Sequence, residues 1–297
     1  MLDSKIEITI TVNDVKRKFY VDAQKSLLLL LREASYFSVK SGCDTVSCGV
    51  CTVLLDGKPI RSCNTKAVDV DGRSITTLEG LSQNGQLHPL QQAFINSGAI
   101  QCGFSTPGLI LTAKALLDKN PNPTDEEIRR ALTGVICRCT GYVRTVEAVR
   151  KAAAMLRGEE AGGYTFLDKP LPEDITQVEI PEAFFRREGG NSPLPPIVYS
   201  PVGLASLKVV GKPEEKVDAR KLALGKPVYA GDLHMEGMLY GALLTSPHAH
   251  AFIRSIDASR ARALPGVHAV LTWQDIPRVK FSSSGQSYPQ PLPYDQV

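Results

Sequence analysis

The sequence has no long hydrophobic run and no block of charges of one sign. The run of leucines at residues 27–31 is far shorter than the roughly 20 apolar residues that cross a bilayer, and the first residues lack the hydrophobic core of a signal peptide. Lys and Arg number 34 against 31 Asp and Glu, a net charge of +3, and no basic stripe is present. We therefore expect a cytoplasmic protein that binds neither nucleic acid nor a membrane.

The second half of the chain lacks cysteine, because no cysteine follows Cys139. Without a secretion signal we expect a reducing compartment, in which closely spaced thiols indicate metal binding or catalysis rather than disulfides. Scattered free cysteines are often core residues, but a close run of three is poorly explained in that way. The seven cysteines are Cys43, Cys48, Cys51, Cys63, Cys102, Cys137 and Cys139.

The first part of the chain predicts an α+β domain over residues 1–80. Hydrophobic residues make up 43% and charged residues 22% of the chain, which is ordinary globular usage. Alternating residues at 5–22 and an Asp-Gly turn within 52–60 predict two β-hairpins. Ser26 can cap a short helix, and residues 68–75 predict further strand.

Helical patterns begin near residue 81, and they predict a four-helix domain over residues 81–160. The expected helices cover residues 89–96, 106–117, 124–132 and 143–156. Residues 161–217 are rich in Pro and Gly and predict a linker. Residues 218–297 predict a second α+β module that stops without a closing element, with strands at 238–244, 253–256 and 267–271 and a helix at 258–264.

The first group of cysteines has the plant-type ferredoxin spacing for a 2Fe–2S cluster. Gly42 and Gly49 would let the backbone wrap closely around such a cluster. Zinc also accepts four cysteines, but its structural sites usually use two separated close pairs, so the spacing favours iron. The candidate ligands are Cys43, Cys48, Cys51 and Cys63.

The cysteines at positions 102, 137 and 139 predict a second cluster site. Such a site needs a fourth ligand, and at that position the sequence has a serine in place of a cysteine. A serine alkoxide is harder and more basic than a thiolate, so its ligation would lower the reduction potential or make the site labile. Two alternatives stay open: the site holds no stable cluster, or Ser105 caps the helix that begins near Pro107. The candidate ligands are Cys102, Ser105, Cys137 and Cys139.

Together the two groups resemble the molybdenum hydroxylases, the family of xanthine dehydrogenase and aldehyde oxidoreductase. Residues 42–51 resemble the family's β-grasp ferredoxin motif, and residues 101–108 with 137–142 resemble its helical 2Fe–2S motif. Segments beyond the linker are similar to the start of the molybdopterin subunit, its α/β hammerhead domain; they are residues 211–213, 225–227, 229–232 and 246–251. The resemblance implies a ferredoxin domain, a four-helix 2Fe–2S domain, a linker and an incomplete hammerhead.

The resemblance also implies an electron path from molybdenum through the helical-domain cluster to the ferredoxin-domain cluster and then to an acceptor. Gln101 and Cys139 occupy the positions that lie against the pterin in such enzymes. Ser105 departs from the family pattern, which has cysteine there. The alternative is a stand-alone carrier with one cluster, or a non-catalytic remnant of such an enzyme.

The domain layout implies partners. The linker is too short to house a flavin domain, so the layout resembles aldehyde oxidoreductases or selenium-dependent xanthine dehydrogenases, a type that residues 285–289 also suggest. The family's molybdenum-coordinating segments and catalytic glutamate lie downstream of a hammerhead. We therefore expect no catalytic residue in this chain, a separate molybdopterin-binding catalytic part, and an FAD subunit or another acceptor. The substrate, a purine or an aldehyde, is not indicated.

Overall fold

The computed structural model describes residues 5–159, 215–227, 229–275, 280–281 and 290–291. The chain divides into two units, Met1–Leu233 and His234–Val297, which are described separately. Most of the expected linker, the segment at residues 211–213 and the segment at residues 285–289 lie outside the described residues.

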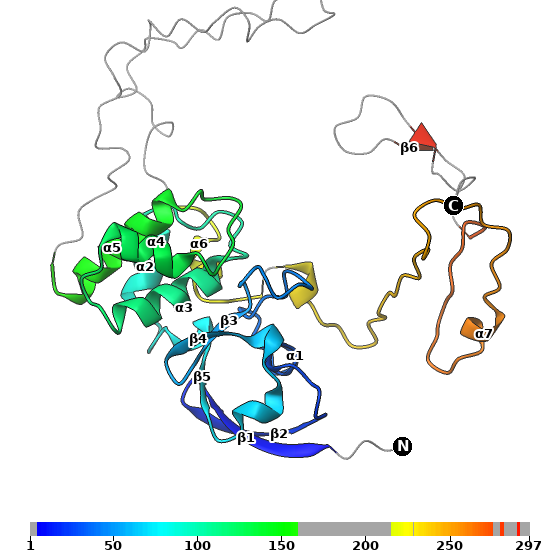
Figure 1. Ribbon diagram of the computed structural model, residues 1–297, viewed down its shortest axis with the longest axis horizontal. Helices are drawn as coiled ribbons and strands as arrows, with labels where there is room; N and C mark the ends of the chain where they lie inside the picture. Colours follow the sequence, from blue (N-terminus) through cyan, green and yellow to red (C-terminus); the bar gives the residue numbers. More distant parts are fainter. Residues whose placement is uncertain (1–4, 160–214, 228, 276–279, 282–289, 292–297) are drawn as a thin grey trace, which may run out of the picture. The chain divides into compact units, whose positions relative to one another are not determined.

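The first unit opens with a five-stranded sheet in the order β2-β1-β5-β3-β4 (Figure 1). The hairpin of β1 and β2 turns at Asn13 and Asp14, which both take positive φ, and β3 and β4 form the second expected hairpin. β5 lies parallel to β1 and antiparallel to β3. The strands are β1 (Ile6–Val12), β2 (Val15–Val21), β3 (Thr52–Leu55), β4 (Lys58–Arg61) and β5 (Ser74–Thr76).

The sheet buries its alternate residues beneath helix α1 (Leu27–Glu33). Ser26 accepts a hydrogen bond from the Leu29 backbone N–H, as expected for the N-cap. Alternation along β1 places Ile8, Ile10 and Val12 in a core shared with the leucines of α1. The predicted strand around residues 68–75 is only partly correct. Residues 67–70 form a 3₁₀ helix, and only β5 extends as a strand between β1 and β3.

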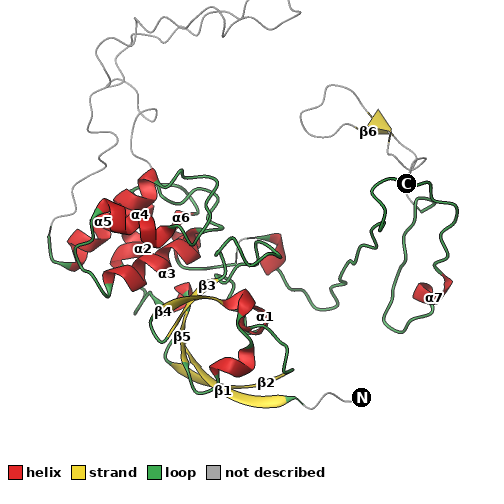
Figure 2. Cartoon of the chain, in the orientation of Figure 1, coloured by secondary structure: helices red, strands yellow, loops and turns green. Residues whose placement is uncertain are grey.

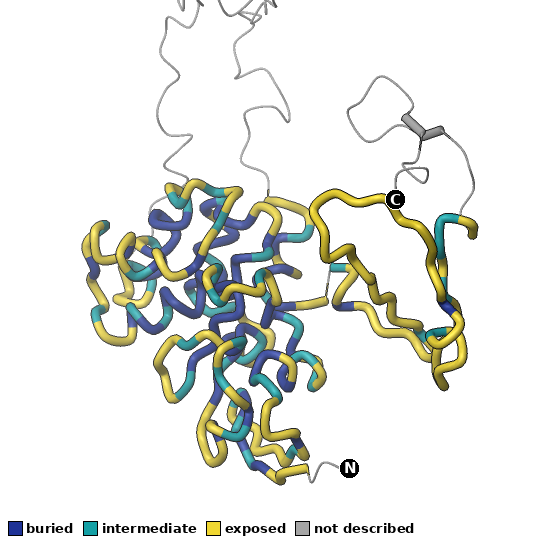
Figure 3. The backbone as a smooth tube through the Cα atoms, turned by 45° about the vertical axis from the view of Figure 1, so that its right-hand side comes forward, coloured by how far each residue is buried: buried dark blue, intermediate teal, exposed yellow. Residues whose placement is uncertain are grey.

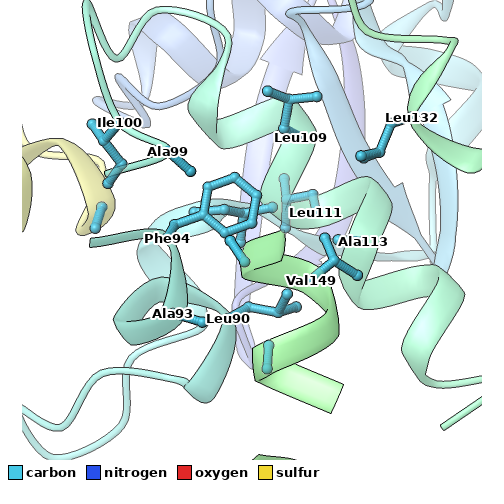
Figure 4. Close-up of a cluster of buried hydrophobic side chains, with 14 of the residues drawn as sticks. Leu90, Ala93, Phe94, Ala99, Ile100, Leu109, Leu111, Ala113, Leu132 and Val149 are labelled. Atoms are coloured by element: carbon cyan, nitrogen blue, oxygen red, sulfur yellow. The ribbon is translucent and has the colours of Figure 1, made fainter. Parts of the chain in front are cut away.

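Four helices follow, at the positions that the sequence predicts (Figure 2). A capping box of Thr124 and Glu127 starts the third. Phe94 lies at the centre of their core among Leu90, Leu109, Leu111 and Val149 (Figure 4). The helices are α2 (Pro89–Asn96), α3 (Thr106–Leu117), α4 (Asp125–Leu132) and α5 (Val143–Leu156).

A short helix beyond the linker, α6 (Ala219–Ala223), belongs to the same core as α2 and α3. A 3₁₀ turn, η7 (Ala230–Asp232), follows it and ends the first unit. The order of elements in this unit therefore places the cysteine loops between α1 and β3, after β4, before α3, and between α4 and α5.

The second unit differs from its expected regular structure. The predicted strands at residues 238–244, 253–256 and 267–271 are wrong, since none of these described residues is in a strand. Most of residues 234–275 are exposed, as the colours of Figure 3 show, so this segment lacks the cover that a half-buried strand needs. The expected helix is shortened to α7 (Ser259–Arg262), and a two-stranded pair joins β6 (Lys280–Phe281) to β7 (Gln290–Pro291).

Candidate functional site

The first cysteine group forms two hydrogen-bonded pairs of side chains. The Cys48 thiol donates to the Cys43 sulfur, and the Cys63 thiol donates to the Cys51 sulfur. Three of these residues lie on the loop between α1 and β3, while Cys63 lies in a 3₁₀ turn (Ser62–Asn64) directly after β4. The fold thus joins the thiols that the spacing singled out.

Two cysteines at this site have strongly shifted pKa values, in opposite directions. Hydrogen bonds from the Cys48 backbone N–H, the Cys48 thiol and nearby N–H groups lower the pKa of Cys43 to about 6. Burial, with the hydrogen bond to Cys51, raises the pKa of Cys63 to about 11. Four thiols with N–H groups directed at a sulfur are the donor set that an iron–sulfur cluster requires, so the residues fit that group.

Two backbone features shape the first loop. Val46 has a φ of 58°, which is a strained conformation for a β-branched residue, and its carbonyl accepts a hydrogen bond from Arg61 at 2.6 Å. At Gly42 a Cβ atom would lie 2.6 Å from a Val50 methyl and 3.4 Å from the Cys48 sulfur. The glycine therefore leaves room for this cysteine side chain, in line with the close wrapping expected here.

The second group repeats the pairing with one hydroxyl. The Cys102 thiol donates to the Cys139 sulfur, and the Ser105 hydroxyl donates to the Cys137 sulfur. Thr140 Oγ1 adds a hydrogen bond to the Cys137 sulfur at 3.2 Å. Burial by itself raises the pKa of Cys137, but the bonds from Ser105 and Thr140 outweigh it and lower that pKa.

The side chain of Ser105 does not cap helix α3. Ser105 occupies the N-cap position, but its side chain makes no capping hydrogen bond, so the alternative that assigned it to capping is wrong. The hydroxyl is buried and bonds to Cys137 instead. Pro107 near the start of the helix supplies no N–H, so this end has one donor fewer to satisfy.

Tyr142 holds the loop that carries Cys137. Its hydroxyl donates to the Val135 carbonyl at 2.9 Å and accepts from the Cys137 backbone N–H at 2.8 Å. Tyr142 itself takes a φ of 65°, in the left-handed region. The motif containing Tyr142 was noted in the sequence, but nothing in its spacing indicated that the phenol would tie residue 135 to residue 137.

We expect Tyr142→Phe to lower the free energy of unfolding by about 1–3 kcal/mol, because the Cys137 N–H loses its partner. The matched control is Tyr20→Phe, since the Tyr20 hydroxyl bonds to Glu7 on an exposed face. Urea unfolding of the two variants measures the difference. Equal midpoints for Tyr142→Phe and Tyr20→Phe would contradict this role.

The two cysteine loops touch each other. The Ile136 backbone N–H donates to the Cys48 carbonyl at 2.8 Å, one residue before Cys137. Gly49 lies directly against Gly134, with no room for a side chain between them. A backbone contact of this kind sets the two groups side by side, although Cys48 and Cys137 are far apart in the sequence.

Other expected residues lie at the surface. Gln101, Cys102 and Cys139 are exposed, whereas Cys51 is buried. In the part of the chain that the structure describes, no three His, Cys, Asp or Glu side chains gather as a ready site for one metal ion. No described helix is long and apolar enough to span a bilayer.

Three family models match the chain. Residues 10–77 match the 2Fe-2S iron-sulfur cluster binding domain, residues 77–150 match the [2Fe-2S] binding domain, and residues 224–294 match the a/b hammerhead domain of aldehyde oxidase and xanthine dehydrogenase. Together these matches follow the order of the two cysteine groups and the segment beyond the linker.

Individual relatives agree with this assignment. Aldehyde oxidoreductase of Megalodesulfovibrio gigas is 38% identical over 275 residues, which is 91% of this chain and 27% of that protein. The nicotinate dehydrogenase small FeS subunit of Eubacterium barkeri is 50% identical over 150 residues, which is 50% of this chain and 96% of that subunit. The solved aldehyde oxidoreductase of Desulfovibrio desulfuricans has a TM-score of 0.71 at 36% identity, over 93% of this chain and 28% of that one.

The chain spans about a quarter of the length of the aldehyde oxidoreductases that it matches. It covers 96% of the nicotinate dehydrogenase small FeS subunit. On these grounds the chain belongs to the molybdenum hydroxylase family, and it contains the 2Fe–2S electron-transfer portion of such an enzyme.

Proposed function

We propose that this chain carries electrons from a molybdenum–pterin site to an acceptor through two 2Fe–2S clusters. The observation that carries the proposal is the shared arrangement of the two sites, each with four side chains in two hydrogen-bonded pairs. A two-iron cluster with four protein ligands suits such pairs, one pair for each iron. The bound clusters would supply the one-electron chemistry, which no amino-acid side chain here provides.

The ligands of the two clusters follow from these pairs. For the first cluster we propose Cys43 with Cys48 on one iron and Cys51 with Cys63 on the other. For the second we propose Cys102 with Cys139 and Ser105 with Cys137. Ser105 would ligate as the alkoxide, a harder ligand than a thiolate, and would lower the reduction potential of that cluster.

The contact between the loops supports direct electron transfer between the two sites. The hydrogen bond from Ile136 to Cys48 joins the backbone of the second site to that of the first. Gln101 and Cys139 are exposed next to the second site, where an outside group can reach them. We therefore assign Gln101 and Cys139 to the contact with the pterin, and the ferredoxin-like site to the exit toward the acceptor.

The domain boundaries and partners are part of the proposal. We place the ferredoxin-like domain at residues 1–80, the helical domain at 81–160, the linker at 161–217 and the hammerhead segment at 218–297, in keeping with the three matched ranges. The partner is a molybdopterin-binding catalytic polypeptide or region, in a cytoplasmic enzyme that hydroxylates a purine or an aldehyde. A separate FAD subunit or another carrier would accept the electrons.

Iron and acid-labile sulfide per chain, together with EPR of the anaerobic dithionite-reduced protein, test this proposal. We expect about four irons and two distinct signals in the parent chain. Ser105→Ala should fall to about two irons and one signal, whereas Ser105→Cys should keep both signals and raise the potential of one. Ser74→Ala is the control, because Ser74 is an exposed residue of β5, outside all the cysteine loops.

A chain with one cluster is the second candidate, and the absence of a fourth thiol at residue 105 favours it. About two irons in both the parent chain and Ser105→Ala would establish that reading and overturn the proposed ligation by serine. Zinc in place of iron at the first site would overturn both.

A further inference from the structure

Residues 215–227 and 229–233, here called the strap, lie on the iron–sulfur part of the first unit. Helix α6 buries Ala219, Leu222 and Ala223 in the core that also contains α2 and α3. The side chain of Gln91, which is completely buried, donates to the Ala223 carbonyl at 2.7 Å. The strap is therefore held by apolar burial and by a buried hydrogen bond, although the linker separates it from these helices in the sequence.

The strap contacts three consecutive residues of the loop before α3. The Tyr229 hydroxyl donates to the Cys102 carbonyl at 2.6 Å, and the Tyr229 ring meets the Phe104 ring edge-on at 5.3 Å. Between them Gly103 has a φ of 82°, and a Cβ atom there would lie 2.5 Å from Leu222. The strap thus contacts this loop at residues 102–104, while the side chains of Gln101 and Cys102 stay exposed.

Asp232 fastens the end of the strap to the ferredoxin-like domain. Its side chain is 2% exposed, and its carboxylate accepts from Lys40 Nζ and from Arg32, each at 3.0 Å. Arg32 also donates to the Gly231 carbonyl at 2.9 Å, and the Lys40 ammonium lies 4.4 Å from the centre of the Tyr229 ring. Both cations lie on the ferredoxin-like side, so the strap bridges the two iron–sulfur domains.

We propose that the strap is a docking element, by which the molybdenum-side polypeptide attaches non-covalently to the iron–sulfur part directly over the Cys102 loop. The receptor on the iron–sulfur part consists of Arg32, Lys40, Gln91, Gly103 and Phe104. It combines a desolvated charge pair, an aromatic anchor and a buried amide, which are the features that dominate the energy of protein interfaces. The strap is then a non-covalent joint between the two parts.

Cleavage of the linker in the full chain tests the joint. A recognition sequence for a specific protease is inserted between Gly189 and Gly190, the folded protein is cut, and the pieces are separated by size-exclusion chromatography. We expect the piece that begins with the strap to co-elute with the iron–sulfur piece. Asp232→Asn should weaken this association at least about tenfold, while Asp257→Asn, an exposed aspartate of the second unit, should not change it.

Separation of the pieces in the cut parent chain, or equal association of Asp232→Asn and Asp257→Asn, would overturn the proposal. Hydrogen–deuterium exchange of the uncut chain provides a second measurement that does not depend on iron. Tyr229→Phe should speed exchange at residues 101–105 about fivefold, as the loss of one hydrogen bond predicts. Unchanged exchange there, with a normally folded β1–β2 hairpin, would also count against the strap as the support of this loop.

Discussion

Gly49→Ala is expected to abolish iron binding at the first site and to lower the melting temperature by more than alanine at any other glycine that the structure describes. A Cβ atom at this position would lie 1.9 Å from the Gly134 carbonyl oxygen and 2.9 Å from the Gly134 carbonyl carbon. The obstacle is backbone, which has no rotamer to move out of the way. The φ of 69° adds a left-handed conformation that alanine tolerates poorly.

The damage should reach both cysteine loops. Gly49 lies between Cys48 and Cys51, and its own carbonyl accepts a hydrogen bond from Thr52 Oγ1 at 2.6 Å. To admit a methyl group, the first loop must move away from residues 134–136, and the hydrogen bond from Ile136 to Cys48 must break. Because Cys137 follows Ile136, we expect the second site to lose iron as well.

Gly57→Ala is the matched control for Gly49→Ala. Gly57 has a φ of 78°, but a Cβ atom there meets nothing within 4 Å, so alanine adds only backbone strain of about 1–2 kcal/mol. Thermal unfolding and iron per chain compare the two variants. If Gly49→Ala retained as much iron as Gly57→Ala and melted at the same temperature, the close approach of the two loops would not hold.

Asp232→Asn is expected to lower the free energy of unfolding by about 3–5 kcal/mol, because it removes the negative charge that is hydrogen-bonded to the buried Lys40 ammonium at 3.0 Å. Burial lowers the pKa of Lys40 in spite of its bond to Asp232, so this cation is costly even in the parent chain. Burial also opposes ionisation of Asp232, but hydrogen bonds from Lys40 and Arg32 outweigh it and lower the pKa of the carboxyl. The Lys40 ammonium and the Asp232 carboxylate are therefore both opposed by burial, and the hydrogen bond between them favours the charged form of each.

A double variant separates the charge from the packing. Lys40→Met with Asp232→Leu replaces the carboxylate and the more deeply buried of its two cations by apolar side chains of similar size, while Arg32 is 19% exposed and keeps access to water. We expect the double variant to recover part of the stability lost in Asp232→Asn. Denaturant unfolding of Asp232→Asn, Lys40→Met and the double variant measures the coupling. If the losses in free energy of unfolding at the two positions simply added, the ion pair between Lys40 and Asp232 would not contribute to holding the strap.

Short-range patterns predicted most of the regular structure in the first unit. The turn at Asn13 and Asp14, the cap at Ser26 and the capping box at Thr124 each lie within a few residues of the element that they start or join. Their energies are local, so composition and spacing reveal them. The expected strands beyond residue 233 were wrong because a strand is stable only beside another, and alternation does not say whether a partner is present.

The amino-acid sequence by itself predicted the two groups of candidate ligands, since the close spacing of Cys43, Cys48 and Cys51 already limits what they can bind. Only the tertiary structure decided where the side chain of Ser105 is directed, because capping of α3 and ligation of a cluster were both compatible with its position in the sequence, and its hydroxyl bonds to the Cys137 sulfur. The close approach of Gly49 to Gly134 and the contacts of the strap were also visible only in the tertiary structure. Such contacts join segments that are distant in the chain, and their energy comes from shape and burial that no periodicity records.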